Sequence, residues 1–153
     1  MTKNKTKFEN PEDRDFFEKL LCGNSTTIDS YGHFFDFRPV AEKRREFNRC
    51  RKKLFEDLSQ KYGKDCFLKY PCLCDLNSGL AIDHLIPLST NKLNKALRQL
   101  KPLPGKKVIT QSFGSNHIDN LVIACNNCNN HKKHRLLDHD KICSILKRKQ
   151  IAL

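Results

Sequence analysis

The chain has 153 residues, of which 29 are Lys or Arg and 17 are Asp or Glu, so its formal net charge is +12. A surplus of this size favours a polyanionic partner, nucleic acid before a membrane surface. The length suits a single domain with a modest core, and no apolar run approaches the ~20 residues that span a bilayer.

The N-terminal segment MTKNKTKFEN is polar and lacks the apolar core of a signal peptide. We therefore expect a cytoplasmic protein with no membrane segment. In that compartment the eight cysteines are better explained by a metal site and buried core thiols than by disulfides. Cys22, Cys50 and Cys143 fall on apolar faces of predicted helices, which favours core positions for them.

Apolar spacing predicts two helices in the N-terminal part of the chain. The first covers residues 11–22, because Pro11 suits a first turn and Gly23 a helix end. Residues 24–39 are predicted to be irregular. The second helix covers about 39–62 and ends at Gly63. Its polar face is strongly basic and could be a solvated face or a phosphate-contacting surface; it carries Lys43, Arg44, Arg45, Arg49, Arg51, Lys52 and Lys53.

The segment from His84 through His117 contains no Asp or Glu. Its spacing predicts a short helix at about 91–100, behind an Asn91 cap. We interpret residues of about 88–113 as a basic insertion that faces phosphates, although a long surface loop is the alternative. Its basic residues include Lys92, Lys95, Arg98, Lys106 and Lys107.

Cysteine spacing predicts a structural zinc site. Cys125 and Cys128 form a C-x2-C pair, and Cys72 and Cys74 would complete a tetrahedral set of four thiolates. Cys66 lies nearby and competes with the upstream pair. A helix is expected to begin within CNNCNNHKKH and to end near residue 137. A last helix is expected from residue 138, packed through Ile142, Ile145 and Leu146.

Asp83 and His84 interrupt the apolar run LAIDHLIP. An unpaired carboxylate is costly to bury, so this pair is unusual as pure packing. Neighbouring side chains in a strand point to opposite faces, so the carboxylate could hold a hard divalent cation while the imidazole takes a proton from water. A hydrogen-bonded structural pair is the alternative reading.

The order of these pieces resembles the HNH endonucleases, whose fold is called ββα-metal. The resemblance covers about residues 72–132 and rests on C-x-C, IDHLIPLS and GSNHIDNLVIACNNCNNHK. In that family a β-hairpin and a helix hold one divalent metal over the scissile phosphate. The resemblance implies that His84 is the general base, that Asp83 and Asn129 hold the metal, and that Asn120 ties the loop to the strand and orients His84. It also places Lys132 near the phosphate.

Two features depart from the family pattern. The third motif residue is Asn129 rather than a histidine, and His131 or His134 could take that role instead. An Asp and Asn pair favours Mg²⁺ (or Mn²⁺) over softer metals. The separation of Asp83 from Asn120 is longer than in a minimal motif, because the basic insertion lies between them. His33, His117 and His139 have no motif support, so surface or capping roles are expected.

The sequence therefore predicts an α+β protein with a helical, basic N-terminal region at 1–62 and an HNH nuclease domain at 63–153. We expect a DNA endonuclease of a restriction, phage or defence type, with structural Zn²⁺; RNA is the less favoured substrate. A homodimer would allow both strands to be cut. The alternatives are a non-catalytic zinc-knuckle protein that binds nucleic acid and a ribosome-associated zinc protein.

Overall fold

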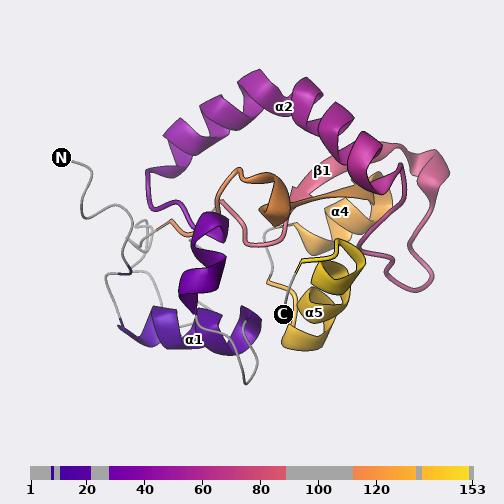
Figure 1. Ribbon diagram of the computed structural model, residues 1–153. Helices are drawn as coiled ribbons and strands as arrows, with labels where there is room; N and C mark the ends of the chain where they lie inside the picture. The colour runs from indigo at the N-terminus through magenta and orange to yellow at the C-terminus, as the bar shows by residue number, and fades with distance from the viewer. Residues whose placement is uncertain (1–7, 9–10, 22–27, 89–111, 134–135, 152–153) are drawn as a thin grey trace, which may run out of the picture.

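The computed structural model describes residue 8 and residues 11–21, 28–88, 112–133 and 136–151. These residues form a mixed α+β structure in which helices surround a two-stranded antiparallel sheet (Figure 1). The predicted helix at 91–100 and nearly all of the basic insertion lie outside the described residues. Within the described part of the chain, the helices are too short or too polar to cross a membrane.

The sheet pairs β1 (Leu80–His84) with β2 (Leu121–Cys125), in a register that runs from Leu80 opposite Cys125 to His84 opposite Leu121. Alternation gives the sheet two different faces. One face carries Leu80, Ile82 and Ile123 and packs against α2 (Val40–Tyr62). The other face joins the main core, and α4 (Asn126–Lys132) begins directly after β2.

The long basic helix forms as the sequence predicts. It begins after Pro39 and ends at Gly63, whose φ of 80° lies in the region that favours glycine. Phe47 and Leu58 bury their side chains against the strands, so α2 arches over the sheet (Figure 1). Cys50 is exposed rather than in the core, because it lies on the solvent side of this helix.

The main core joins the two ends of the chain. Helix α1 (Pro11–Leu21) matches the predicted first helix and lies beside α5 (His139–Arg148). Between α1 and α2, the segment expected to be irregular contains a 3-10 helix, η1 (Ile28–Phe34), that also packs into this core. The N-terminal region is therefore packed against the rest of the chain through shared clusters.

The C-terminal helices have the expected order. Asp138 caps α5 by accepting a hydrogen bond from the Lys141 amide at 2.8 Å, and the predicted residues Ile142, Ile145 and Leu146 are buried. Helix α4 is shorter than expected and ends at Lys132. The next residue, Lys133, has a positive φ of 51°, which ends the helix there.

Hydrogen bonds hold the two ends of the segment between the strands together, next to the sheet. The Asn120 side chain accepts from the Ile86 amide at 2.8 Å and donates to the carbonyls of Ile86 and Ser115 at 3.1 and 2.7 Å. Gly114 passes so close to this strand end that a Cβ built on it would lie 2.0 Å from the Ile86 carbonyl oxygen. Only glycine fits this close approach.

Lys149 joins α5 to the start of β2. Its side chain is almost fully buried, and Nζ donates to the carbonyls of Ile118, Asp119 and Leu121 at 2.9, 2.7 and 2.7 Å.

We expect Lys149→Met to lower the free energy of unfolding by about 1–3 kcal/mol, because buried carbonyls lose their donor. Lys147→Met, at an exposed position of the same helix, should change it by less than about 0.5 kcal/mol. Urea unfolding of the two variants measures the difference. Equal effects would contradict this role for the Lys149 ammonium.

Candidate functional site

Four cysteines form a cluster that could hold a metal ion such as zinc. The sulfur atoms of Cys66, Cys74, Cys125 and Cys128 all lie within 4.8 Å of one another. Zinc with Zn–S bonds of about 2.3 Å places its sulfur ligands about 3.8 Å apart, so a small contraction would complete a tetrahedral site. Cys74 is exposed, whereas the other three are buried.

One member of this cluster differs from the expected set. Cys66 takes the place expected for Cys72, and it is the nearby cysteine that competes with the upstream pair. The chain turns sharply at this point, since the amides of Leu73 and Cys74 both donate to the Tyr70 carbonyl. Cys72 sits within the turn with a φ of 64° and its side chain is exposed. Spacing could not separate the two, because only the turn decides which sulfur points inward.

Backbone amides surround these sulfur atoms. Four N–H groups approach three of the sulfurs at 3.4–3.5 Å: Lys69 to Cys66, Tyr70 to Cys128, and both Asp75 and Cys128 to Cys125. Burial opposes ionisation of Cys125, yet the two amides lower the pKa of its thiol to about 6. Burial and neighbouring sulfurs raise the pKa of Cys128 to about 12. A divalent cation would therefore bind with release of protons.

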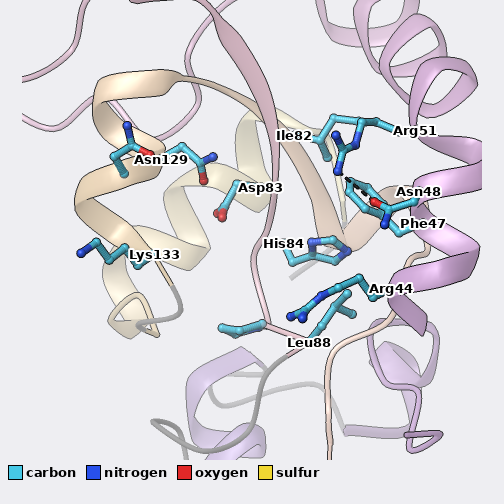
Figure 2. Close-up of a pocket in the computed structure, with 12 residues that line it drawn as sticks. Arg44, Phe47, Asn48, Arg51, Ile82, Asp83, His84, Leu88, Asn129 and Lys133 are labelled. Carbon is cyan, nitrogen blue, oxygen red and sulfur yellow. Dashed lines mark hydrogen bonds between the residues drawn. The ribbon is translucent and has the colours of Figure 1, made fainter. Parts of the chain in front are cut away.

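A polar pocket lies beside this cluster, between α2 on one side and β1 with α4 on the other (Figure 2). Its volume is about 410 Å³. It brings together three of the expected site residues, Asp83, His84 and Asn129. The full lining is Arg44, Phe47, Asn48, Arg51, Ile82, Asp83, His84, Pro87, Leu88, Asn129, Asn130 and Lys133.

Asp83 faces α4 and is paired with a buried ammonium. Lys132 Nζ lies 3.0 Å from Asp83 Oδ2 and donates to the His84 carbonyl at 2.9 Å. Burial raises the pKa of Asp83, while Lys132 acts in the opposite direction. Lys132 is fully buried, so its expected position as a phosphate contact is wrong. Its charge is used inside the protein, to balance a carboxylate.

His84 faces α2, as alternation along β1 requires. The ring of Phe47 contacts it edge-on, with 4.8 Å between the ring centroids, and Nε2 lies 2.8 Å from Asn116 Oδ1. Burial lowers the pKa of His84 to about 4, although the bond with Asn116 acts in the opposite direction. The imidazole is therefore neutral near pH 7 and can accept a proton.

The two asparagines of the GSNHIDN segment have different roles. Asn120 ties the loop to the strand end, as expected, and its side-chain amide bonds to Ile86 and Ser115. The side chain that contacts His84 belongs instead to Asn116, which the sequence analysis missed. The signal was present in the same segment, but asparagine is common in loops and its spacing matches no motif residue.

Asn129 lines the pocket together with Asp83 and His84, as expected. In Figure 2, Asp83 and Asn129 lie on the α4 side and His84 lies nearer α2. His131 is exposed and packs on Tyr70, with 4.7 Å between the ring centroids, so it does not line the pocket. His134, the other alternative, lies outside the described residues.

Basic side chains form the rim of the pocket. Arg44 and Arg51 come from α2, and Lys133 follows α4. Arg45 points elsewhere and lines a separate hollow with Glu42 and Glu46. The remaining expected nucleic-acid contacts fall outside the described residues: Lys92, Lys95, Arg98, Lys106 and Lys107.

A second group of metal-ligand types, His33, His117 and Asp119, is explained by local structure. His117 caps the 3-10 helix η3 (Ile118–Asn120), and its Nδ1 accepts from the Asp119 amide at 3.1 Å. His33 Nε2 bonds to the Asp119 carboxylate at 2.8 Å. The capping role expected for His117 is confirmed. The ring nitrogen of His117 and the carboxylate of Asp119, which could bind a metal, are both already engaged in hydrogen bonds.

The identity of the fourth cysteine can be tested by paired substitutions. We expect Cys66→Ser to lower the zinc content of purified protein well below one ion per chain and to destabilise the fold, because it removes a cluster thiolate. Cys72→Ser should retain both zinc and stability. Elemental analysis and thermal unfolding measure both. The reverse pattern would contradict the assignment of Cys66.

The pocket and the cysteine cluster meet at α4, which contributes Cys128 to the cluster and Asn129 to the pocket. Comparisons with protein-family models, curated proteins and solved structures find no match to this chain.

Proposed function

We propose that this protein is a divalent-metal-dependent endonuclease of the HNH type that hydrolyses phosphodiester bonds in DNA. One observation carries the proposal: Asp83, His84 and Asn129 line a single pocket whose rim holds Arg44 and Arg51. A carboxylate, an amide, a neutral imidazole and two guanidinium groups are the parts that metal-assisted phosphodiester hydrolysis needs.

The donor set of the pocket fits a hard cation. The carboxylate of Asp83 and the side-chain oxygen of Asn129 would hold Mg²⁺ or Mn²⁺, since both are oxygen ligands. When bound, such an ion supplies Lewis-acid stabilisation of charge on the phosphate. Because Lys132 already neutralises much of the Asp83 charge, the chain alone offers a weak site. Substrate phosphate oxygens would complete it, as is common for Mg²⁺.

His84 accepts the proton of the attacking water in this proposal. Its low pKa keeps the ring neutral, and its place on the opposite face of β1 from Asp83 separates the base from the metal ligands. Arg44, Arg51 and Lys133 bind the flanking phosphates in this proposal. Their positively charged side chains line the pocket, and such groups pair well with phosphate oxygens.

The cysteine cluster has a structural role in the proposal. Cys128 precedes Asn129 on α4, and Cys125 ends β2. A zinc ion bound there would fix the strand–helix junction and hence the position of Asn129. The same cluster with a basic surface also suits a non-catalytic nucleic-acid-binding protein, so the decisive difference lies in His84.

We expect wild-type protein to nick or cut plasmid DNA with Mg²⁺, and His84→Ala to lose about 10²- to 10⁴-fold in rate, the usual contribution of a general base. His131→Ala, at an exposed histidine outside the pocket, should retain activity. Agarose-gel assays of supercoiled plasmid measure these rates. Binding without cleavage by wild type would favour the non-catalytic alternative.

Paired substitutions on α2 test the rim of the pocket. Arg51→Ala should weaken DNA binding and reduce the salt dependence of log K by about 0.7–0.9, the value for one phosphate contact. Arg49→Ala is the matched control, because Arg49 is exposed and lines the separate hollow. Fluorescence anisotropy at several salt concentrations gives both slopes. Equal losses in the two variants would count against a specific role for the rim.

A further inference from the structure

We propose that Asn116 is a positioning residue for His84: it holds the imidazole proton on Nε2 and so leaves Nδ1 as the proton acceptor. The inference rests on the proposed function and names a residue that the HNH resemblance does not include. It follows from one chain of hydrogen bonds that begins on α2 and ends at His84.

The first step fixes the orientation of the Asn116 amide. Its Nδ2 donates to the Lys43 carbonyl oxygen at 2.8 Å. A carbonyl oxygen only accepts, so the group that faces it must be the NH2 group. The Asn116 oxygen is therefore the atom that faces His84, and the two possible amide orientations are not equivalent.

The second step fixes the proton of His84. Asn116 Oδ1 lies 2.8 Å from His84 Nε2, and an amide oxygen can only accept. The ring must therefore present an N–H at Nε2. In a neutral imidazole the other nitrogen, Nδ1, then carries the lone pair. The other tautomer would face two acceptors toward each other, and a ring turned over would present Cε1–H to the amide oxygen in place of the Nε2–H donor.

The third step concerns what holds Asn116 itself. Lys43 is fully buried, and its Nζ donates to the carbonyls of Asp36 and Gly114, both at 2.6 Å. Gly114 in turn lies against the Ile86 carbonyl, at a distance that excludes any Cβ. The backbone just before Asn116 is thus fixed between α2 and the end of β1, which limits where its side chain can go.

Helix α2 also holds the other side of the ring. Phe47, one turn after Lys43, contacts His84 edge-on. Arg44 and Arg51 of the same helix line the pocket. One rigid helix therefore sets the base tautomer, the ring plane and the phosphate-binding rim together, so a shift of α2 would disturb all three.

Direct observation of the tautomer tests the inference without any activity measurement. Two-bond ¹H–¹⁵N correlation spectra of histidine-labelled protein distinguish protonation at Nε2 from protonation at Nδ1, and His84→Ala assigns the signals. We expect a single Nε2–H tautomer in wild type and a mixture in Asn116→Ala. An Nδ1–H tautomer in wild type, or an unchanged spectrum in the variant, would overturn the inference.

Kinetics provide the second test. Asn116→Ala should lower kcat by about 10- to 100-fold with little change in KM, because a misdirected base affects the chemical step. In a His84→Ala background it should cause no further loss. Ser115→Ala is the control: its Oγ bonds to the His33 carbonyl, so it reports on loop structure alone and should leave kcat near wild type.

The outcomes separate this inference from the proposed function. If wild type cleaves DNA and depends on His84, while Asn116→Ala and Ser115→Ala behave alike, the positioning role is wrong and the endonuclease stands. If wild type does not cleave DNA at all, the proposed function fails, and the tautomer measurement still decides whether Asn116 orients the ring.

Discussion

The alternation of side chains along β1 is the constraint on which the candidate site depends. His84 shares a face with Leu80 and Ile82 and meets α2, whereas Asp83 meets α4. A register shift of one residue would exchange these two faces. The pairing with β2 is held at both ends, by Cys125 in the cysteine cluster and by the Leu85 amide, which donates to the Asn120 carbonyl at 2.8 Å.

Buried lysines connect the elements around this sheet. Lys43, Lys132 and Lys149 are at most 2% exposed, and each donates to backbone carbonyls from another part of the chain. Fixed oxygen acceptors replace only part of the lost hydration, because burial lowers the pKa of Lys43 to about 8 and that of Lys149 to about 7. Part of the net charge of +12 is therefore structural, and the charge offered to a polyanion depends on side chains such as Arg44 and Arg51.

Much of the local structure could be predicted from the sequence, because helical spacing and end residues are local signals. Both N-terminal helices, the start of the last helix near residue 138 and the stripe of Ile142, Ile145 and Leu146 illustrate this. The strand pair and the convergence of Asp83, His84 and Asn129 were expected through the HNH resemblance rather than from periodicity. Whether that family applies to this chain is still a proposal.

The failures have a common physical cause, which is that side-chain direction depends on tertiary packing. Cys66 and Cys72 are equally suitable ligands in the sequence, and a turn after Tyr70 decides between them. Lys132 was expected near the phosphate, yet it is buried and pairs with the carboxylate of Asp83. Asn116 could not be found by spacing, since its contact with His84 joins residues 32 positions apart.

The proposed endonuclease activity is tested most directly by the dependence of DNA cleavage on Mg²⁺ in zinc-loaded wild-type protein. We expect supercoiled plasmid to be converted to nicked or linear forms at a rate that rises with Mg²⁺ concentration and saturates. Protein that binds the plasmid but leaves it supercoiled at every Mg²⁺ and Mn²⁺ concentration would contradict the central claim.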